Sequence, residues 1–365
     1  MTVGFHGPLP PARSGVADYC AALLGELRRH GRVAVAPERS DVALYHLGNN
    51  SLHAAIYRRA LRHPGLIVLH DAVLHHFLLG QLDQEEYVDE FAYNYGGWHR
   101  PLARELWRAR AASGSDPRYF EYPMLKRVVE RSLAVVVHNP AARALVLRAA
   151  PAARVAEIPH LFSPPELPTL ADALRWRQAL GIGPVFLYGV FGYLRESKRL
   201  MQVLDVFARV HRELPRTALL VAGQFASRDL ERAARPLVTA PGVLRLPYLE
   251  EREFWLVARA VEACINLRYP TAGETSGISI RLMGLGKPVL VTGGAENARF
   301  PEDACIRIPA GLAEPDSLYH HLILLPSFPL VAASLGERAA ASIAAVHGIQ
   351  QVGEEYWNLL GEYSG

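Results

Sequence analysis

Short apolar segments rich in β-branched residues alternate with segments of helical periodicity through the first 165 residues. This pattern predicts six strands, at residues 3–7, 32–37, 42–48, 65–70, 133–139 and 155–160. Helices fill most of the gaps, and the clearest one begins after Ser14, whose side chain suits an N-cap. Strands that alternate with helices are typical of a parallel sheet with crossover helices.

The alternation stops between residues 71 and 132, where the pattern is helical and dense in aromatic residues. These aromatic residues are Tyr87, Phe91, Tyr93, Tyr95, Trp98, Trp107, Tyr119, Phe120 and Tyr122. Aromatic side chains at helical spacing usually form a core, and this is the interpretation we favour. A helical insertion in an α/β domain is also a usual place for specificity, so a role in ligand binding stays open.

Three prolines interrupt residues 161–183, which we interpret as an interdomain connection. A second alternating series follows, with strands predicted near 185–190, 217–223, 243–248, 263–269, 288–292 and 304–309. We therefore expect two Rossmann-like doubly wound α/β domains, at residues 1–165 and 166–345, which face each other across a cleft. The tail from 312 to 363 has a helical pattern, and a C-terminal helix at 346–365 can pack back on the first domain.

Composition adds limits on size, partners and location. The chain of 365 residues is too long for one ordinary core, and its net charge of +3 is too small to argue for a nucleic-acid partner. Cys20, Cys264 and Cys305 have apolar neighbours and no pairing or metal spacing, so we interpret them as core residues. No signal-peptide pattern is present, and no apolar run approaches the about 20 residues that span a bilayer. We expect a cytoplasmic protein without a transmembrane segment, which leaves a peripheral membrane contact open.

Three strand-to-helix turns offer backbone amides to an anion. The first runs through a proline-rich loop to Gly15 at a helix start, although Gly15 can equally be a simple helix-start glycine. The second places Gly189 and Gly192 after an apolar strand and Lys198 near the start of a long amphipathic helix. Glycines permit close backbone approach, and a lysine suits phosphate oxygens, although no P-loop or dinucleotide motif is present.

The third turn is the segment ETSGI, in which Glu274 precedes the helix-start amides of residues 275–278. Those amides and the helix dipole favour an anion. A carboxylate directly ahead of them is better placed to accept hydrogen bonds from sugar hydroxyl groups. The competing interpretation is that Glu274 or Ser276 only caps the helix.

Polar residues also follow two strands of the first domain. His70 and Asp71 end one strand, with His75 and His76 close behind, and His46, Asn49 and Asn50 end another. Four candidate ligands so close in sequence rarely all face one ion, so we expect no metal site. A histidine at the carboxyl end of a strand can orient a substrate group.

Taken together, these motifs resemble the retaining nucleotide-sugar glycosyltransferases of family four, which have the two-domain GT-B fold. The segments that carry the resemblance are GPLPPARSGVADY, YHLGNN, LHDAVLHH, VVVHN, IPH, FGYLRESKR and RYPTAGETSGISIRLMGLGKPVLVT. They span the chain in the family's order. The resemblance implies transfer of a sugar from a nucleoside diphosphate sugar to a hydroxyl acceptor, with no cofactor beyond the nucleotide sugar.

The resemblance also implies roles for individual residues. The catalytic group would comprise His70, Glu274 and Lys198. Donor binding would involve Gly15, Gly192, Arg195, Lys198, Glu274, Thr275, Ser276, Gly277, Ile278 and Arg281. Acceptor binding would involve Asn49, Asn50, Asp71 and His138, and the acceptor would be a small molecule, a glycan or a lipid-linked sugar.

Two positions depart from the family pattern. The family's phosphate-binding arginine aligns with Tyr193, and Arg195 is the nearest replacement. The family's second glutamate, which bonds the ribose, aligns with Arg281, and arginine has only donors. With these two departures, the resemblance implies transferase chemistry but no particular donor.

The implied mechanism is metal-independent front-face attack, in which the leaving phosphate takes the acceptor's proton. Two alternatives remain open at this point: a nucleotide-sugar 2-epimerase and a non-catalytic nucleotide-sugar-binding protein. An oxidoreductase is disfavoured because no dinucleotide fingerprint follows a predicted strand.

Overall fold

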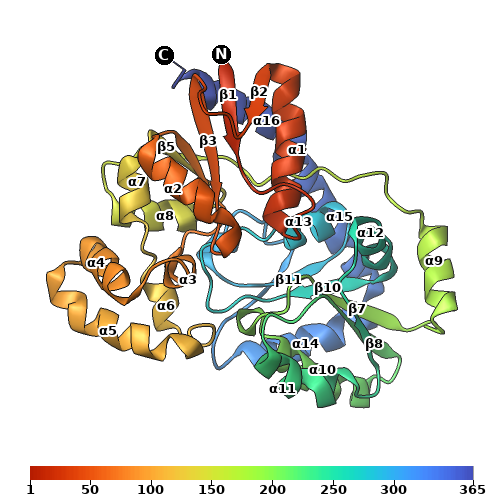
Figure 1. The fold of residues 1–365 in the computed structure, drawn as a ribbon. Helices are drawn as coiled ribbons and strands as arrows, with labels where there is room; N and C mark the ends of the chain where they lie inside the picture. Colours follow the sequence, from red (N-terminus) through yellow and green to blue (C-terminus); the bar gives the residue numbers. More distant parts are fainter. Residues whose placement is uncertain (365) are drawn as a thin grey trace. The chain divides into compact units, whose positions relative to one another are not determined.

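A parallel six-stranded sheet is built from the first half of the chain in the computed structural model, which describes residues 1–364 (Figure 1). Its strands are β1 (Thr2–His6), β2 (Arg32–Val35), β3 (Val42–Leu47), β4 (Leu66–Leu69), β5 (Ala134–Val137) and β6 (Val155–Glu157). Their order is β2-β1-β3-β4-β5-β6, and all neighbours are parallel. All six strands predicted in this half are confirmed.

The contacts between residues in space divide the chain into two compact units, each with its own sheet. The first unit contains Met1–Ser163, the short segment Pro270–Thr275 and the C-terminal residues from Val346 onward. The second unit contains Pro164–Tyr269 and Ser276–Ala345.

Alternate residues of the first sheet enter two different cores. Leu66 and Val68 of β4 pack with helix α1 (Gly15–His30), whereas Ile67 and Leu69 pack on the opposite face. Because a strand's side chains point to opposite faces in turn, a fully apolar strand such as β4 is buried on both sides. The first face is also covered by α16 (Ile349–Gly361), whose Tyr356 shares a 2.9 Å hydrogen bond with Tyr19 of α1.

The predicted helical insertion is confirmed as a group of short helices. They are α3 (His75–Leu79), α4 (Gln84–Tyr95), α5 (Arg100–Ala109), α6 (Arg118–Glu121) and α7 (Lys126–Arg131). Tyr87, Phe91 and Tyr119 are fully buried there, which confirms that these aromatic residues form a core. Trp98 and Tyr93 are exceptions, since they are 80% and 39% exposed.

The second sheet has the strand order β12-β11-β10-β7-β8-β9, again entirely parallel. Its strands are β7 (Phe186–Phe191), β8 (Thr217–Ala222), β9 (Val243–Leu246), β10 (Ala263–Asn266), β11 (Val289–Thr292) and β12 (Ile306–Ile308). The helices of this unit include α9 (Leu170–Ala179), α10 (Leu200–Glu213), α11 (Arg228–Val238), α12 (Glu251–Ala260) and α13 (Gly277–Gly284). All six strands predicted for this half are confirmed.

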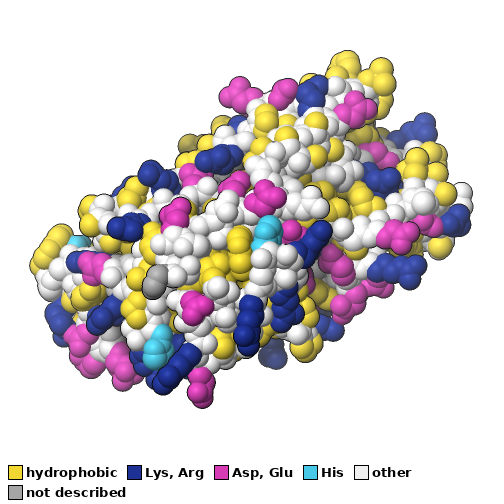
Figure 2. Space-filling model, turned by 90° about the horizontal axis from the view of Figure 1, so that it is seen from above, with side chains coloured by type: hydrophobic (Ala, Val, Ile, Leu, Met, Phe, Trp, Pro, Cys, Tyr) yellow, Lys and Arg dark blue, Asp and Glu magenta, His cyan; other side chains and the backbone are white. Residues whose placement is uncertain are grey.

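The predicted helical tail is confirmed as α14 (Glu314–Ser327), α15 (Pro329–Val346) and α16. Among residues 1–364, no single helix meets the length and apolarity that a bilayer span needs, although the bent pair α14 and α15 meets them together. All three cysteines are buried, which confirms that they are core residues. Figure 2 shows acidic and basic side chains interspersed on the face in view, as a near-neutral chain of this composition would have.

Candidate functional site

The strand orders locate the loops that can bind a ligand in each unit. In a parallel sheet the order reverses at a switch point, where the loops after two neighbouring strands diverge and leave a crevice. In the first unit this point lies between β1 and β3, and in the second it lies between β7 and β10. The loops that follow these strands carry most of the residues that the sequence singles out.

In the second unit, Gly192 follows β7 with a φ of +92°, a region that L side chains rarely adopt. A β-carbon at this position would lie 3.2 Å from Lys198 Nζ and 3.5 Å from Ile278 Cγ1. Lys198 is buried, and its ammonium donates a 2.5 Å hydrogen bond to the carbonyl oxygen of Phe191. The structure therefore brings together Gly192, Lys198 and the first turn of α13.

The start of α13 is held by a small polar network. Ser276 is the N-cap, and its Oγ accepts a hydrogen bond from the Ser279 amide at 3.2 Å. The Asn266 amide group, at the end of β10, donates to Ser276 Oγ at 2.7 Å and to Ser279 Oγ at 2.6 Å. The amides of Gly277 and Ile278 lie in the first turn, which has no intrahelical acceptors, so they are oriented for an anion.

A residue that the sequence analysis missed lies at the same place. Arg268 follows β10, and its Nη2 donates to Ser276 Oγ at 3.3 Å, while its backbone amide donates to Thr292 Oγ1 at 2.9 Å. The next amide, of Tyr269, donates to the Ser197 carbonyl at 2.7 Å and so joins this loop to the turn that carries Lys198. In the sequence, Arg268 is recognisable as a basic residue directly after a buried strand. The strand order then places the end of that strand at the switch point.

The two departures from the family pattern have definite positions. The Arg195 guanidinium is exposed and lies over the Tyr193 ring, 5.6 Å from its centroid. Arg281 donates to Glu251 Oε2 at 2.5 Å. Its guanidinium also lies 4.0 Å from the ring centroid of Phe254. The position of the expected ribose-binding carboxylate thus holds a paired arginine, and Glu251 supplies a carboxylate beside it.

Glu274 belongs to the short segment that groups with the first unit. Its Oε2 accepts hydrogen bonds from the Ala272 amide at 2.7 Å and from Thr271 Oγ1 at 3.2 Å. Asn139, the N-cap that follows β5, donates from Nδ2 to the Gly273 carbonyl at 3.0 Å and to Thr275 Oγ1 at 2.9 Å. The carboxylate is therefore oriented by its own turn, and that turn is bonded to a loop at the carboxyl edge of the first sheet.

Gly15 begins α1, where Ser14 caps the helix by accepting a 3.1 Å hydrogen bond from the Ala17 amide. A β-carbon at Gly15 would meet no atom within 4 Å. Packing within the protein does not require glycine here, so the open space beside it can admit a ligand.

The carboxyl edge of the first sheet carries a cluster of buried histidines. His46 Nδ1 lies 3.1 Å from His70 Nε2, and the ring centroids of His70 and His138 are 5.3 Å apart. The rings of Tyr19 and His70 meet edge to face, with their centroids 4.8 Å apart. Burial lowers the pKa of His70 and of His46 well below the usual value, and it lowers the pKa of His138 to about 4. All three rings are therefore neutral at neutral pH.

The residues predicted to bind an acceptor are mostly engaged with the protein. The Asn49 amide donates to Asp71 Oδ2 at 2.7 Å, which joins the loops after β3 and β4. Asn50 caps a short turn by accepting from the Leu52 amide at 3.0 Å, and His138 Nδ1 donates to the Ile158 carbonyl at 2.9 Å. These bonds position the loops, and acceptor contact by these residues stays a prediction.

The four candidate metal ligands His70, Asp71, His75 and His76 do not converge on one point. His75 is bonded to Tyr122 and Tyr87, whereas His76 is bonded to Ser113 and Asn49. Within residues 1–364, the group whose possible ligand atoms lie within 4.8 Å of one another is Cys20, His46 and His70. Burial raises the pKa of the Cys20 thiol, so a metal would have to displace its proton.

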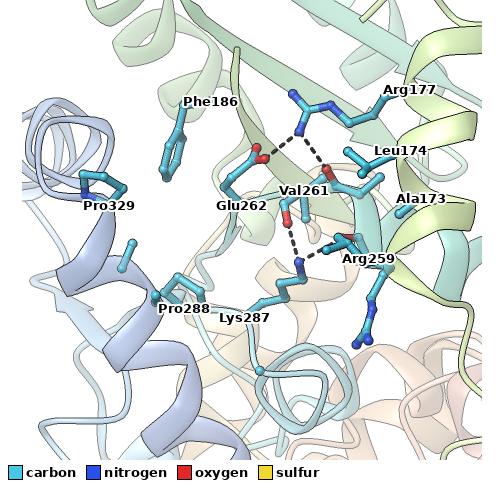
Figure 3. A pocket seen from close by; sticks show the side chains of 15 residues that line it. Ala173, Leu174, Arg177, Phe186, Arg259, Val261, Glu262, Lys287, Pro288 and Pro329 are labelled. Carbon is cyan, nitrogen blue, oxygen red and sulfur yellow. Dashed lines mark hydrogen bonds and ion pairs between the residues drawn. The ribbon is translucent and has the colours of Figure 1, made fainter. Parts of the chain in front are cut away.

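A cavity of about 290 Å³ in the second unit lies away from these loops (Figure 3). It is lined by Leu174 of α9 and Pro329 of α15, and by Phe186 and Pro288 at the amino ends of β7 and β11. Lys287 donates to two carbonyl oxygens at the end of α12, those of Arg259 at 2.9 Å and Val261 at 2.7 Å. Its charged group is thus used within the fold, at the edge of the sheet opposite the switch-point loops.

No family model matches the sequence, and no curated protein matches it. Several solved structures have a similar fold over the whole chain. HepE of Anabaena in complex with UDP-glucose is 15% identical, with a TM-score of 0.66 and coverage of 99% of this chain and 100% of its own.

Sucrose-phosphate synthase of Thermosynechococcus elongatus is 14% identical, with a TM-score of 0.68 and coverage of 99% and 98%. WaaG, a glycosyltransferase involved in lipopolysaccharide biosynthesis, is 14% identical, with a TM-score of 0.63 and coverage of 99% of both chains. Together with the two parallel six-stranded sheets, this likeness shows that the chain has the GT-B fold.

Proposed function

We propose that this chain is a glycosyltransferase that moves a sugar from a nucleoside diphosphate sugar to a hydroxyl acceptor. The observation that carries the proposal is the meeting of Gly192, Lys198 and the first turn of α13 at the switch point of the second sheet. A glycine without a side chain, a buried ammonium group and free helix amides together suit a diphosphate. The likeness to HepE, a protein solved with UDP and with UDP-glucose, supports this class of donor.

Departure of the nucleoside diphosphate leaves negative charge, which must be stabilised in the transition state. Lys198 and the α13 amides provide part of this stabilisation. Arg268 supplies the second cation in our proposal, in place of the family arginine whose position Tyr193 occupies. The fork of donors on a guanidinium matches phosphate oxygens, and Arg268 already reaches the N-cap of α13.

The sugar and the ribose would be bound by different carboxylates. Glu274 would accept hydrogen bonds from hydroxyl groups of the transferred sugar, since its turn already orients the carboxylate. Glu251, which pairs with Arg281, would accept the ribose hydrogen bond that position 281 cannot accept. The pair would also explain why an arginine is tolerated there.

We further propose that transfer proceeds with retention, without a metal and without a cofactor beyond the nucleotide sugar. Lys198 and Arg268 supply positive charge that a metal would otherwise contribute. The acceptor would be a small molecule, a glycan or a lipid-linked sugar, and a cytoplasmic location remains a prediction.

The direct test is calorimetric titration of the full chain with UDP, GDP and their sugars, followed by mass spectrometry for transfer. Lys198→Ala and Arg268→Ala should each weaken diphosphate binding about tenfold or more, because a hydrogen bond to a charged group contributes about 1.5–3 kcal/mol. Glu274→Ala should lose most transfer while the chain stays folded. Lys126→Ala is the matched control, since this lysine lies over Tyr93 in the helical insertion.

The proposal would be contradicted if the chain bound no nucleoside diphosphate tightly. It would also be contradicted if Lys198→Ala and Arg268→Ala both left the binding unchanged. Release of an epimerised nucleotide sugar without an acceptor would identify an epimerase. Donor binding without hydrolysis or transfer would identify a binding protein.

A further inference from the structure

The bond between His46 and His70 bears on what His70 can do in the proposed transfer. His70 follows β4, and its Nε2 makes the bond to His46. The other ring nitrogen is Nδ1. The ring is 7% exposed, and Nδ1 is not among the buried side-chain atoms that lack a partner. Nδ1 is therefore the atom that His70 can offer to a ligand.

Two neighbouring histidines show which tautomer this cluster favours. His53 Nδ1 lies 2.9 Å from the His46 carbonyl, and His138 Nδ1 lies 2.9 Å from the Ile158 carbonyl. A carbonyl oxygen only accepts, so both Nδ1 atoms carry the proton. The Nε2 atoms of both rings are buried and have no partner in the described part of the chain. Each Nε2 atom thus carries a lone pair that accepts no hydrogen bond from these residues.

His46 admits two arrangements. If His70 Nε2 donates to His46 Nδ1, then His46 Nε2 carries a hydrogen that is buried and has no acceptor within residues 1–364. If His46 Nδ1 donates instead, His46 Nε2 is a buried lone pair, as in His53 and His138. An orphaned buried N–H group is rarer than an unsatisfied acceptor, so the second arrangement is favoured.

We infer that His46 is a positioning residue that holds His70 as the tautomer protonated on Nδ1. His70 then accepts from His46 at Nε2 and presents an N–H donor to a ligand oxygen, of a sugar hydroxyl or a phosphate. It has no free lone pair, so it does not take the acceptor's proton. This inference rests on the proposed function for the identity of that ligand.

This arrangement agrees with the proton transfer that the resemblance implies. The acceptor oxygen forms a bond to the anomeric carbon, the bond from that carbon to the phosphate oxygen breaks, and the acceptor's proton moves to the departing phosphate. His70 orients one of the reacting groups by donating a hydrogen bond, and it remains neutral throughout.

The first test reads the tautomer without any need for activity. Two-bond ¹⁵N–¹H correlation spectra of the full chain, labelled in histidine and assigned with a His70→Gln sample, show which ring nitrogen is protonated. We expect His70 to be protonated on Nδ1 at neutral pH, and to lose this single state in His46→Leu. His70 protonated on Nε2 in the wild-type protein would overturn the inference, even if transfer is observed.

The second test separates a donor from a base. Glutamine can donate a hydrogen bond but cannot take a proton, and leucine can do neither. We expect His70→Gln to stay within about tenfold of wild-type kcat and His70→Leu to lose more, whereas loss of a general base would cost about 10²–10⁴-fold in both. Equal large losses would overturn the inference. Failure of all variants and the wild type to bind any nucleotide sugar would instead refute the proposed function, while the spectra still decide the tautomer.

A third variant tests the positioning role itself. His46→Gln keeps an amide donor beside His70 Nε2, whereas His46→Leu removes it. We expect the glutamine variant to restore both the Nδ1–H signal and kcat relative to leucine, with thermal melting showing that both are folded. His75→Leu is the matched control for loss of a buried histidine, since His75 bonds to Tyr122 and Tyr87 of the helical insertion.

Discussion

At the scale of single residues, two glycines that the sequence assigns to donor binding have opposite reasons for being glycine. Gly192 has a positive φ and little room, because a β-carbon there would approach Lys198 Nζ to 3.2 Å. Gly15 has open space around the position of its missing β-carbon. The first is thus required by the fold, and the second only by a ligand that enters the space.

We therefore expect the two glycine variants to separate stability from binding. Gly192→Ala should lower the free energy of unfolding by about 1–2 kcal/mol, because an L residue is strained at positive φ. Gly15→Ala should leave that free energy unchanged or slightly higher, yet weaken nucleotide-sugar binding. Chemical denaturation and calorimetry measure the two effects, and unaltered affinity in Gly15→Ala would remove Gly15 from the donor site.

At the scale of elements, α16 shows how a distant segment completes the first unit. Val352, Tyr356 and Leu360 are fully buried against the face of the first sheet that α1 also covers. The shared hydroxyl bond between Tyr19 and Tyr356 is buried between the two helices. Burial raises the pKa of both phenols, so both stay protonated and one donates to the other.

This bond permits a double-mutant cycle. Tyr19→Phe or Tyr356→Phe alone should cost about 1–3 kcal/mol, because each leaves a buried hydroxyl without its partner. The double variant should be less destabilised than the sum of the two, since both polar groups are gone. Additive losses in urea denaturation would mean that the hydroxyl groups are satisfied in another way.

At the scale of the whole molecule, buried neutral histidines link stability to pH. Burial lowers the pKa of His138 to about 4 and, with the charge of His76, the pKa of His75 to about 3, from an ordinary value of 6.5. At a pH between the lowered pKa of the folded chain and the ordinary pKa of 6.5, the unfolded chain binds more protons than the folded chain. The free energy of unfolding should therefore fall as the pH decreases below 6.5.

The expected slope is about 1.4 kcal/mol per pH unit for each such histidine once the pH is well below 6.5. Denaturation series between pH 7.5 and about 5 measure it. His75→Leu should reduce the slope, because one of the groups that titrates only in the unfolded chain is gone. A stability that is flat over this range would show that the unfolded chain retains the same histidine environments.

The sequence by itself determined the secondary structure and the fold class. All twelve strands, the helical insertion and the helical tail follow from periodicity, because burial on one or both faces of an element imposes a local pattern that can be read along the chain. The turns around Gly15, Gly192 and Glu274 were also visible locally, since glycines and helix caps mark where strands end and helices begin.

Only the tertiary structure decided which of those turns meet. Strand order brings the loop of Arg268, after β10, beside the turn that follows β7, and it brings His46, near the end of β3, beside His70. The pairing of Arg281 with Glu251 was equally invisible, because thirty residues separate them. Periodicity records how each element is buried but not which neighbour lies beside it, so contacts between strand ends appear only when the sheets are assembled.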